Sequence, residues 1–217
     1  MKEQPVYEEK FHNLTINIYQ DDDLINPIKE WDMLGSFICW HRNYNLCSKD
    51  VLTNRRDAGK DQLLFESPDD FKDWLKENPA IVLPLFLYDH SGITIRTTTF
   101  NDRWDSGQVG YVFVTEEKIK KEYSKKRISN ALRNKVEEIL KAEVKTFDDY
   151  LTGNVYGYTV DNEKVEQLAS CWEFYGDYEG ECLTEAREEA KYYYEKQQKE
   201  KAIEQTIDGL GCILQLA

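Results

Sequence analysis

Two polar turns of this chain carry residues that could transfer protons. Asp89 and His90 lie in an Asp-His-Ser-Gly segment, and Asp105 lies in a Trp-Asp-Ser-Gly segment. A carboxylate beside a histidine can orient the imidazole or share a metal ion with it. Together with His41, these side chains could form a metal-assisted or general-base site, as in a small hydrolase or nuclease. Asp, Ser and Gly are equally typical of turns without a catalytic role.

A second set of residues has the chemistry of zinc ligands. Cys39, His41 and Cys47 are spaced C-x-H-x5-C, and Cys171 or Cys182 could supply a fourth ligand. Thiolate and imidazole are the usual ligands of structural zinc, but the paired CxxC-like segments of zinc ribbons are absent from the sequence. Buried reduced thiols and a hydrogen-bonded histidine explain the same residues. We therefore expect no cofactor, with zinc as the alternative.

The C-terminal part combines acidic and tyrosine residues. Residues 161–189 include ten acidic and two basic side chains. Tyrosine is an effective contact residue at interfaces, and carboxylates can imitate the charge of a nucleic acid. A solvated helix is the alternative interpretation. The candidate partner-binding residues are Tyr175, Asp177, Tyr178, Glu179, Glu181, Glu185, Glu188 and Glu189.

The charge of the 217-residue chain is unevenly distributed. The formal net charge is −13, divided into −6 for residues 1–70, +1 for residues 71–152 and −8 for residues 153–217. Such a protein repels nucleic acids and attracts proteins with basic grooves. The exception is residues 118–127, where six basic residues and one acidic residue could bind phosphates or simply form a solvated helix face.

The hydrophobic pattern predicts an α+β domain. We expect a mostly antiparallel sheet of about six to seven strands, with helices packed on it. Pro84 indicates a bulge or an edge within its strand, because proline cannot donate a ladder hydrogen bond. The expected strands are 14–19, 35–41, 80–89, 93–99, 107–114, 155–161 and 167–175; the expected helices are 67–78, 115–123, 128–151 and 183–210.

The predicted organisation is one domain over residues 1–180, with a polar loop at 42–66, and an acidic C-terminal helix over 181–217. This helix would pack on the domain or project from it. The apolar residues 213–217 would pack on the protein's own core or on a second copy, forming a homodimer. The polar first ten residues do not match a signal peptide, and no apolar stretch is long enough for a membrane helix. We therefore expect a cytoplasmic protein.

Several segments resemble a family of uncharacterised proteins encoded by phages and mobile elements of bacteria, largely Gram-positive. The similarity covers roughly residues 35–175 and departs from the family at residues 45–66. It is carried by Cys-Trp-His-Arg-Asn-Tyr at 39–44, Leu-Pro-Leu-Phe-Leu-Tyr-Asp-His-Ser-Gly-Ile-Thr at 83–94, Trp-Asp-Ser-Gly-Gln-Val-Gly at 104–110, Tyr-Leu-Thr-Gly at 150–153 and Val-Tyr-Gly-Tyr at 155–158.

The resemblance implies an accessory protein of a mobile element, and such proteins often block host defence. We therefore expect an inhibitor of a bacterial defence system, with an anti-CRISPR protein as the leading candidate. It would bind the effector nuclease through its acidic, tyrosine-rich surfaces and block nucleic-acid binding. Two alternatives stay open: a metal-dependent hydrolase or nuclease using His41, Asp89, His90 and Asp105, and a nucleic-acid-binding regulator acting through residues 118–127.

Overall fold

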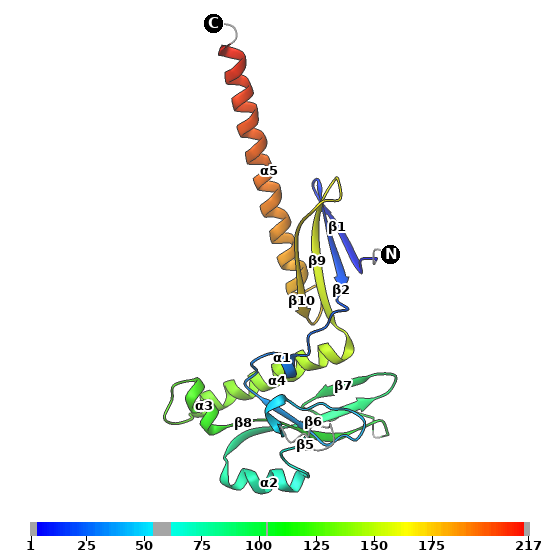
Figure 1. Cartoon of the computed structure of the whole chain (residues 1–217), viewed down its shortest axis with the longest axis vertical. Helices are drawn as coiled ribbons and strands as arrows, with labels where there is room; N and C mark the ends of the chain where they lie inside the picture. The colour runs from blue at the N-terminus through cyan, green and yellow to red at the C-terminus, as the bar shows by residue number, and fades with distance from the viewer. Residues whose placement is uncertain (1–3, 54–61, 103, 215–217) are drawn as a thin grey trace. The chain divides into compact units, whose positions relative to one another are not determined.

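The computed structural model describes residues 4–53, 62–102 and 104–214, which divide into two compact units (Figure 1). Residues 1–24 and 153–217 form one unit, called the acidic unit below. Residues 25–152 form the other, called the central unit. The two ends of the chain therefore share a unit, and the boundary expected after residue 180 lies inside it.

The acidic unit is a four-stranded antiparallel sheet with one long helix. The strand order is β1-β2-β9-β10. The alternating pattern of β2 directs Leu14, Ile16 and Ile18 toward the helix, where they form a core with helix residues such as Ala186 and Ala190. The elements are β1 (Tyr7–Phe11), β2 (Leu14–Gln20), β9 (Val155–Asn162), β10 (Gln167–Tyr175) and α5 (Glu181–Leu214).

Helix α5 covers only one face of this sheet. It runs along the sheet and continues past the end of the strands (Figure 1). Beyond the contact, Ile203 and Ile207 are 60% and 61% exposed. None of the unit's other described elements packs on the opposite face. The apolar segment 213–217 lies outside the described side chains, so the predicted dimer contact stays a prediction.

The central unit is built on a second four-stranded antiparallel sheet, with the order β3-β8-β6-β7. A separate two-stranded sheet pairs β4 with β5. The strands are β3 (Ser36–Cys39), β4 (Leu52–Thr53), β5 (Gln62–Leu63), β6 (Ala80–Asp89), β7 (Ile93–Arg96) and β8 (Ser106–Thr115). The helices are α1 (Pro27–Glu30), the 3-10 turn η1 (Lys49–Val51), α2 (Pro68–Glu77), α3 (Glu116–Glu122) and α4 (Asn130–Thr152).

Helices cover both faces of the central sheet. On one face, Phe147 of α4 packs edge-on against Phe37 at 5.4 Å between ring centroids. On the other face, the ring of Phe71 from α2 lies 4.9 Å from the ring of Phe113 in β8, measured between ring centroids. Helix α2 starts where the sequence predicts, because Ser67 and Asp70 form a reciprocal capping box around the helix start. Sealing both faces gives this unit an extensive aromatic core.

The predicted α+β class, the antiparallel pairing and the C-terminal helix are confirmed. The strands nevertheless form two four-stranded sheets instead of one, because β2 pairs with β9, far along the chain, and not with β3. Strand β1 was not predicted. Its sequence, Tyr-Glu-Glu-Lys-Phe, has too few apolar residues to mark it, yet it completes the edge of the acidic unit's sheet.

The predicted hairpin at Asp89 and His90 is also confirmed. Strands β6 and β7 pair from Phe86 to Asp89, and Gly92 turns the chain with a φ of +150°. Strand β7 pairs only with residues Phe86 to Asp89 of β6. Pro84 therefore has no β7 residue opposite it that would need its missing N–H. A register shift follows at Leu85/Phe86. Among the described residues, no helix is long and apolar enough to cross a membrane.

Candidate functional site

Three of the sequence motifs meet at one end of the central unit's sheet. The Tyr44 hydroxyl donates a hydrogen bond to Asp89 Oδ2 at 3.0 Å. The backbone N–H of Asp89 donates to the carbonyl oxygen of Asp105 at 2.8 Å. The His90 ring places Nδ1 3.1 Å from Asp105 Oδ2. These contacts link the β6–β7 hairpin, the start of β8 and the segment after β3, so the fold brings the proposed catalytic carboxylates and His90 together.

His41, the fourth catalytic candidate, joins this cluster through Tyr44. Its ring stacks on the Tyr44 ring at 4.9 Å between centroids and 18° between planes. The hydrogen bond to Asp89 raises the pKa of the Tyr44 phenol. The cluster is open to solvent: the side chains of His90 and Asp105 are 64% and 41% exposed. An imidazole oriented by a carboxylate can accept a proton at its other nitrogen.

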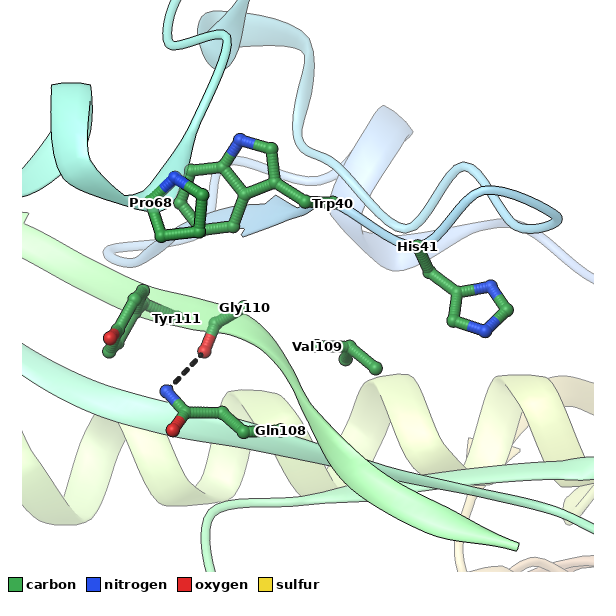
Figure 2. A pocket seen from close by; sticks show the side chains of 7 residues that line it. All are labelled: Trp40, His41, Pro68, Gln108, Val109, Gly110 and Tyr111. Carbon is green, nitrogen blue, oxygen red and sulfur yellow. Dashed lines mark hydrogen bonds between the residues drawn. The ribbon is translucent and has the colours of Figure 1, made fainter.

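A pocket of about 340 Å³ lies beside this cluster (Figure 2). Of the four catalytic candidates, only His41 lines it. Gln108 donates a hydrogen bond to the carbonyl of Gly110 within the wall. Gly110 has no room for a side chain, because a Cβ there would lie 1.9 Å from the Ile38 carbonyl oxygen. The lining residues are Trp40, His41, Pro68, Gln108, Val109, Gly110 and Tyr111.

The proposed zinc ligands Cys39 and Cys47 contact each other through hydrogen bonds. The Cys39 N–H donates to Cys47 Sγ at 3.2 Å, and Cys47 Sγ lies 3.3 Å from the Cys39 carbonyl oxygen. Burial raises the pKa of Cys39 to about 11 and also raises that of Cys47, so both favour the neutral thiol. Cys171 belongs to the other unit. Within the described residues, no three His, Cys, Asp or Glu side chains are grouped to hold a metal ion; the zinc alternative stays a prediction.

The division into units concentrates the negative charge. The acidic unit contains 20 acidic and 8 basic residues, a net charge of −12, whereas the central unit contains 21 acidic and 20 basic residues, a net charge of −1. One of the acidic unit's few cations is already paired, because Arg187 Nη2 lies 2.7 Å from Glu9 Oε2. Nearly the whole net charge of the protein therefore belongs to the acidic unit.

The candidate partner-binding residues fall into two groups. Asp177, Glu179, Glu181 and Glu188 are exposed, as an interface requires. The others are partly covered: Tyr175, Tyr178, Glu185 and Glu189. Tyr178 packs against Tyr7 and Tyr156 at 5.8 and 5.4 Å between ring centroids, so it supports the core of the acidic unit. The exposed carboxylates around the start of α5 are the better candidates for partner contact.

The basic residues 118–127 are partly used within the central unit. Lys118 Nζ donates to the Met33 carbonyl oxygen at 2.9 Å, and Lys120 pairs with Glu116 at 2.9 Å. Lys125, Lys126 and Arg127 are exposed in the turn after α3. This segment therefore offers a smaller basic surface than its sequence indicates, and its binding to nucleic acid stays a prediction.

Comparisons with known proteins give no match: no family model, no curated protein and no solved structure is similar to this chain.

Sequence reasoning missed two features of the candidate surfaces. Tyr44, in the polar segment 42–66, was not chosen as a site residue, although it binds Asp89 and stacks on His41. Trp172 was not singled out because a register shift between Cys171 and Phe174 interrupts the alternation of β10. Aromatic residues within the motif at 39–44 and within β10 were the available signals.

Proposed function

We propose that this protein binds another protein through its acidic unit and occupies a basic surface that would otherwise hold nucleic acid. The observation that carries the proposal is the net charge of −12 on this unit, beside −1 on the central unit. Complementary potentials of this size accelerate association with a basic partner and repel competing polyanions.

The arrangement of the charges supports the same function. The exposed carboxylates come from the strands, the turns and α5, so they form a distributed pattern and not one isolated run. A nucleic acid also presents many negative charges along a surface. The described exposed acidic residues are Glu8, Asp22, Asp23, Glu163, Glu166, Glu173, Asp177, Glu179, Glu181, Glu188, Glu195, Glu200 and Glu204.

The resemblance to mobile-element proteins indicates which partner to test first. We propose inhibition of a bacterial defence system, with a CRISPR effector nuclease as the leading candidate. Such effectors hold nucleic acid in positively charged channels. An acidic protein seated in that channel would block target binding without any chemical step.

A phage challenge tests this function. Bacteria carrying an active CRISPR effector that targets the phage would produce the chain, and plaques would be counted. We expect expression to restore plaques, and the triple variant Glu179→Lys, Glu181→Lys, Glu188→Lys to lose this effect. A matched triple in the central unit, Glu66→Lys, Glu77→Lys, Glu122→Lys, reverses three other exposed charges and should retain it. Equal activity of both triples would contradict the proposal. The proposal would also be contradicted if the wild-type protein restored plaques against none of a panel of bacterial defence systems.

The motif cluster supports a second candidate, a hydrolase or nuclease. The observation that favours it is the convergence of His41, Asp89, His90 and Asp105 on one end of the sheet. In this function Asp105 would orient His90, whose second nitrogen would activate water as a general base. Asp and His side chains in exposed turns also pair without a catalytic role, so the test must separate catalysis from folding.

His90→Ala and Asp105→Asn test the second candidate. Both side chains are exposed, so we expect the melting temperature to change little. A catalytic role predicts a loss of activity in both variants, and a chelator would show whether a divalent ion takes part. Full activity of both variants in the phage challenge would exclude this candidate and leave the binding function in place.

A further inference from the structure

The face of the acidic unit's sheet opposite α5 carries a pair of aromatic rings. Tyr19 of β2 pairs with Gly157 of β9, and the Trp172 ring from β10 lies over Gly157. A Cβ on Gly157 would lie 2.2 Å from a ring carbon of Trp172, so only glycine leaves room for the indole. The two rings stack at 6.2 Å between centroids and 29° between planes. Trp172 nevertheless keeps 42% of its surface exposed.

The backbone around Trp172 fixes this arrangement. The register of β10 shifts between Cys171 and Phe174, and Glu173 adopts a φ of +68°, a conformation that few residues with a side chain adopt. The Glu173 N–H donates to Asp21 Oδ2 at 3.3 Å, and Asp21 is itself buried. The indole is therefore positioned before any partner arrives, which lowers the entropic cost of binding.

Carboxylates follow both aromatic residues closely along the chain. The run Asp21, Asp22 and Asp23 directly follows Gln20, the last residue of β2. Glu173 directly follows Trp172. Asp22, Asp23 and Glu173 are exposed. An indole face attracts cations, and the guanidinium group both stacks on aromatic rings and pairs with carboxylates. The same surface disfavours a phosphate or another anion.

We infer that this face, formed by Tyr19, Gly157 and Trp172 with the neighbouring carboxylates, binds arginine side chains of a basic segment in the partner protein. The inference rests on the proposed function and names the anchor within the acidic unit. Arginine is preferred to lysine because its planar group can stack on the indole and bind a carboxylate at once. The charge of the unit attracts the segment, and Trp172 fixes where it binds.

A titration of labelled nona-arginine peptide with the full chain, followed by fluorescence anisotropy, tests the inference. Trp172→Leu keeps an apolar cover over Gly157 but removes the aromatic face, and we expect a Kd about fivefold higher. Trp172→Phe should restore most of the affinity. Trp104→Leu is the matched control, because Trp104 is 94% exposed in the nearly neutral central unit; its Kd should equal that of the wild type. Melting temperatures confirm that each variant is folded.

The outcomes separate this inference from the proposed function. If Trp172→Leu binds the peptide as tightly as the wild type while the Glu179/Glu181/Glu188 triple binds it more weakly, the arginine anchor is wrong and the acidic binding function stands. Equal losses in Trp172→Leu and Trp104→Leu, or equal affinity for nona-lysine and nona-arginine, also overturn the anchor. If the wild type does not bind nona-arginine, the inferred arginine contact is wrong. The phage challenge then tests the proposed function independently.

Discussion

Each unit of this protein packs a helix of more than twenty residues against one face of a four-stranded antiparallel sheet, and the units differ in the other face and in charge. In the central unit, α2 covers the second face with Phe71 and Trp74. In the acidic unit, no described element of that unit covers the second face, and the net charge is −12. The central unit has nearly balanced charges.

This difference shows that the negative charge is not required by the architecture. A comparable sheet-and-helix core forms in the central unit with a net charge of −1. Like charges repel in a compact unit, so a concentration of carboxylates costs stability. We therefore propose that this charge, which folding does not need, serves binding of a partner.

The largest expected effect comes from breaking the core of the central unit. Phe71 is fully buried and contacts Phe65, Trp74, Tyr111 and Phe113. Phe71→Ala should lower the free energy of unfolding by about 3–5 kcal/mol, because it removes an aromatic ring from a packed core. Hydrogen exchange should accelerate at β6 and β8 but not at β2 and β9. Equal acceleration in both sheets would show that the two cores are not separate.

The reciprocal change weakens the acidic unit. Ile16 is fully buried between the sheet and α5. Ile16→Ala should cost about 2–4 kcal/mol through lost burial and the cavity that remains. We expect faster exchange at β2 and β9, weaker peptide binding and an intact central unit. Unchanged peptide binding in a variant whose acidic unit has opened would place the binding surface elsewhere.

Two glutamates should give the units opposite responses to acid. Burial raises the pKa of Glu143 in the central unit, although its carboxylate accepts N–H bonds from Leu34 and Gly35. The folded state therefore takes up this proton first, and the Glu143 contribution to stability increases as the pH falls through its raised pKa. Hydrogen bonds from Arg187 lower the pKa of Glu9, whose contribution is present above the ordinary glutamate pKa of about 4.3 and is lost as the pH falls below it.

Unfolding curves measured from neutral to acidic pH check both signs. As the pH falls, Glu143 increases the free energy of unfolding of the wild type, and Glu143→Gln should remove this increase. The contribution of Glu9 decreases over the same range, and Glu9→Gln should remove this decrease. Because Glu143→Gln also sacrifices one backbone hydrogen bond, its stability should be lower at neutral pH. The slope against pH is the informative quantity. Identical slopes in the two variants would contradict the assignments.

The smallest effect concerns the thiols. In a Cys171→Ser, Cys212→Ser variant, the remaining cysteines are Cys39, Cys47 and Cys182, all of them buried. Burial raises the pKa of Cys39 to about 11 and that of Cys182 to about 12, so few thiolates form at pH 8. We expect a thiol reagent to modify them only on unfolding. Faster modification after treatment with a chelator would instead support the zinc alternative.

Local signals in the sequence predicted most of the elements. The Ser67 cap, the Asp89–His90 hairpin and the effect of Pro84 each depend on a few neighbouring residues. The pairing of β2 with β9 depends on contacts between residues more than 130 positions apart, which no local pattern encodes. For this reason the sequence alone predicted one sheet, and the two acidic ends of the chain were treated as separate regions.

The candidate sites show the same limit. His41, Asp89, His90 and Asp105 were identifiable by residue type, but their meeting point, and the role of Tyr44 in it, depends on how the strands are ordered. The Trp172 surface needs both the irregularity in β10 and the glycine opposite it. Exposure also changed the interpretation of Tyr178, which is partly buried and packs against the core of the acidic unit.

The most direct test of the acidic unit as the binding surface is competition with DNA for a purified CRISPR effector that the phage challenge identifies. Increasing amounts of the chain would be added to an effector bound to labelled target DNA, and the released DNA would be measured. The account predicts that wild-type protein and the Glu66/Glu77/Glu122 triple release the DNA equally, whereas the Glu179/Glu181/Glu188 triple needs at least about tenfold more protein. Equal release by the two triples would contradict it.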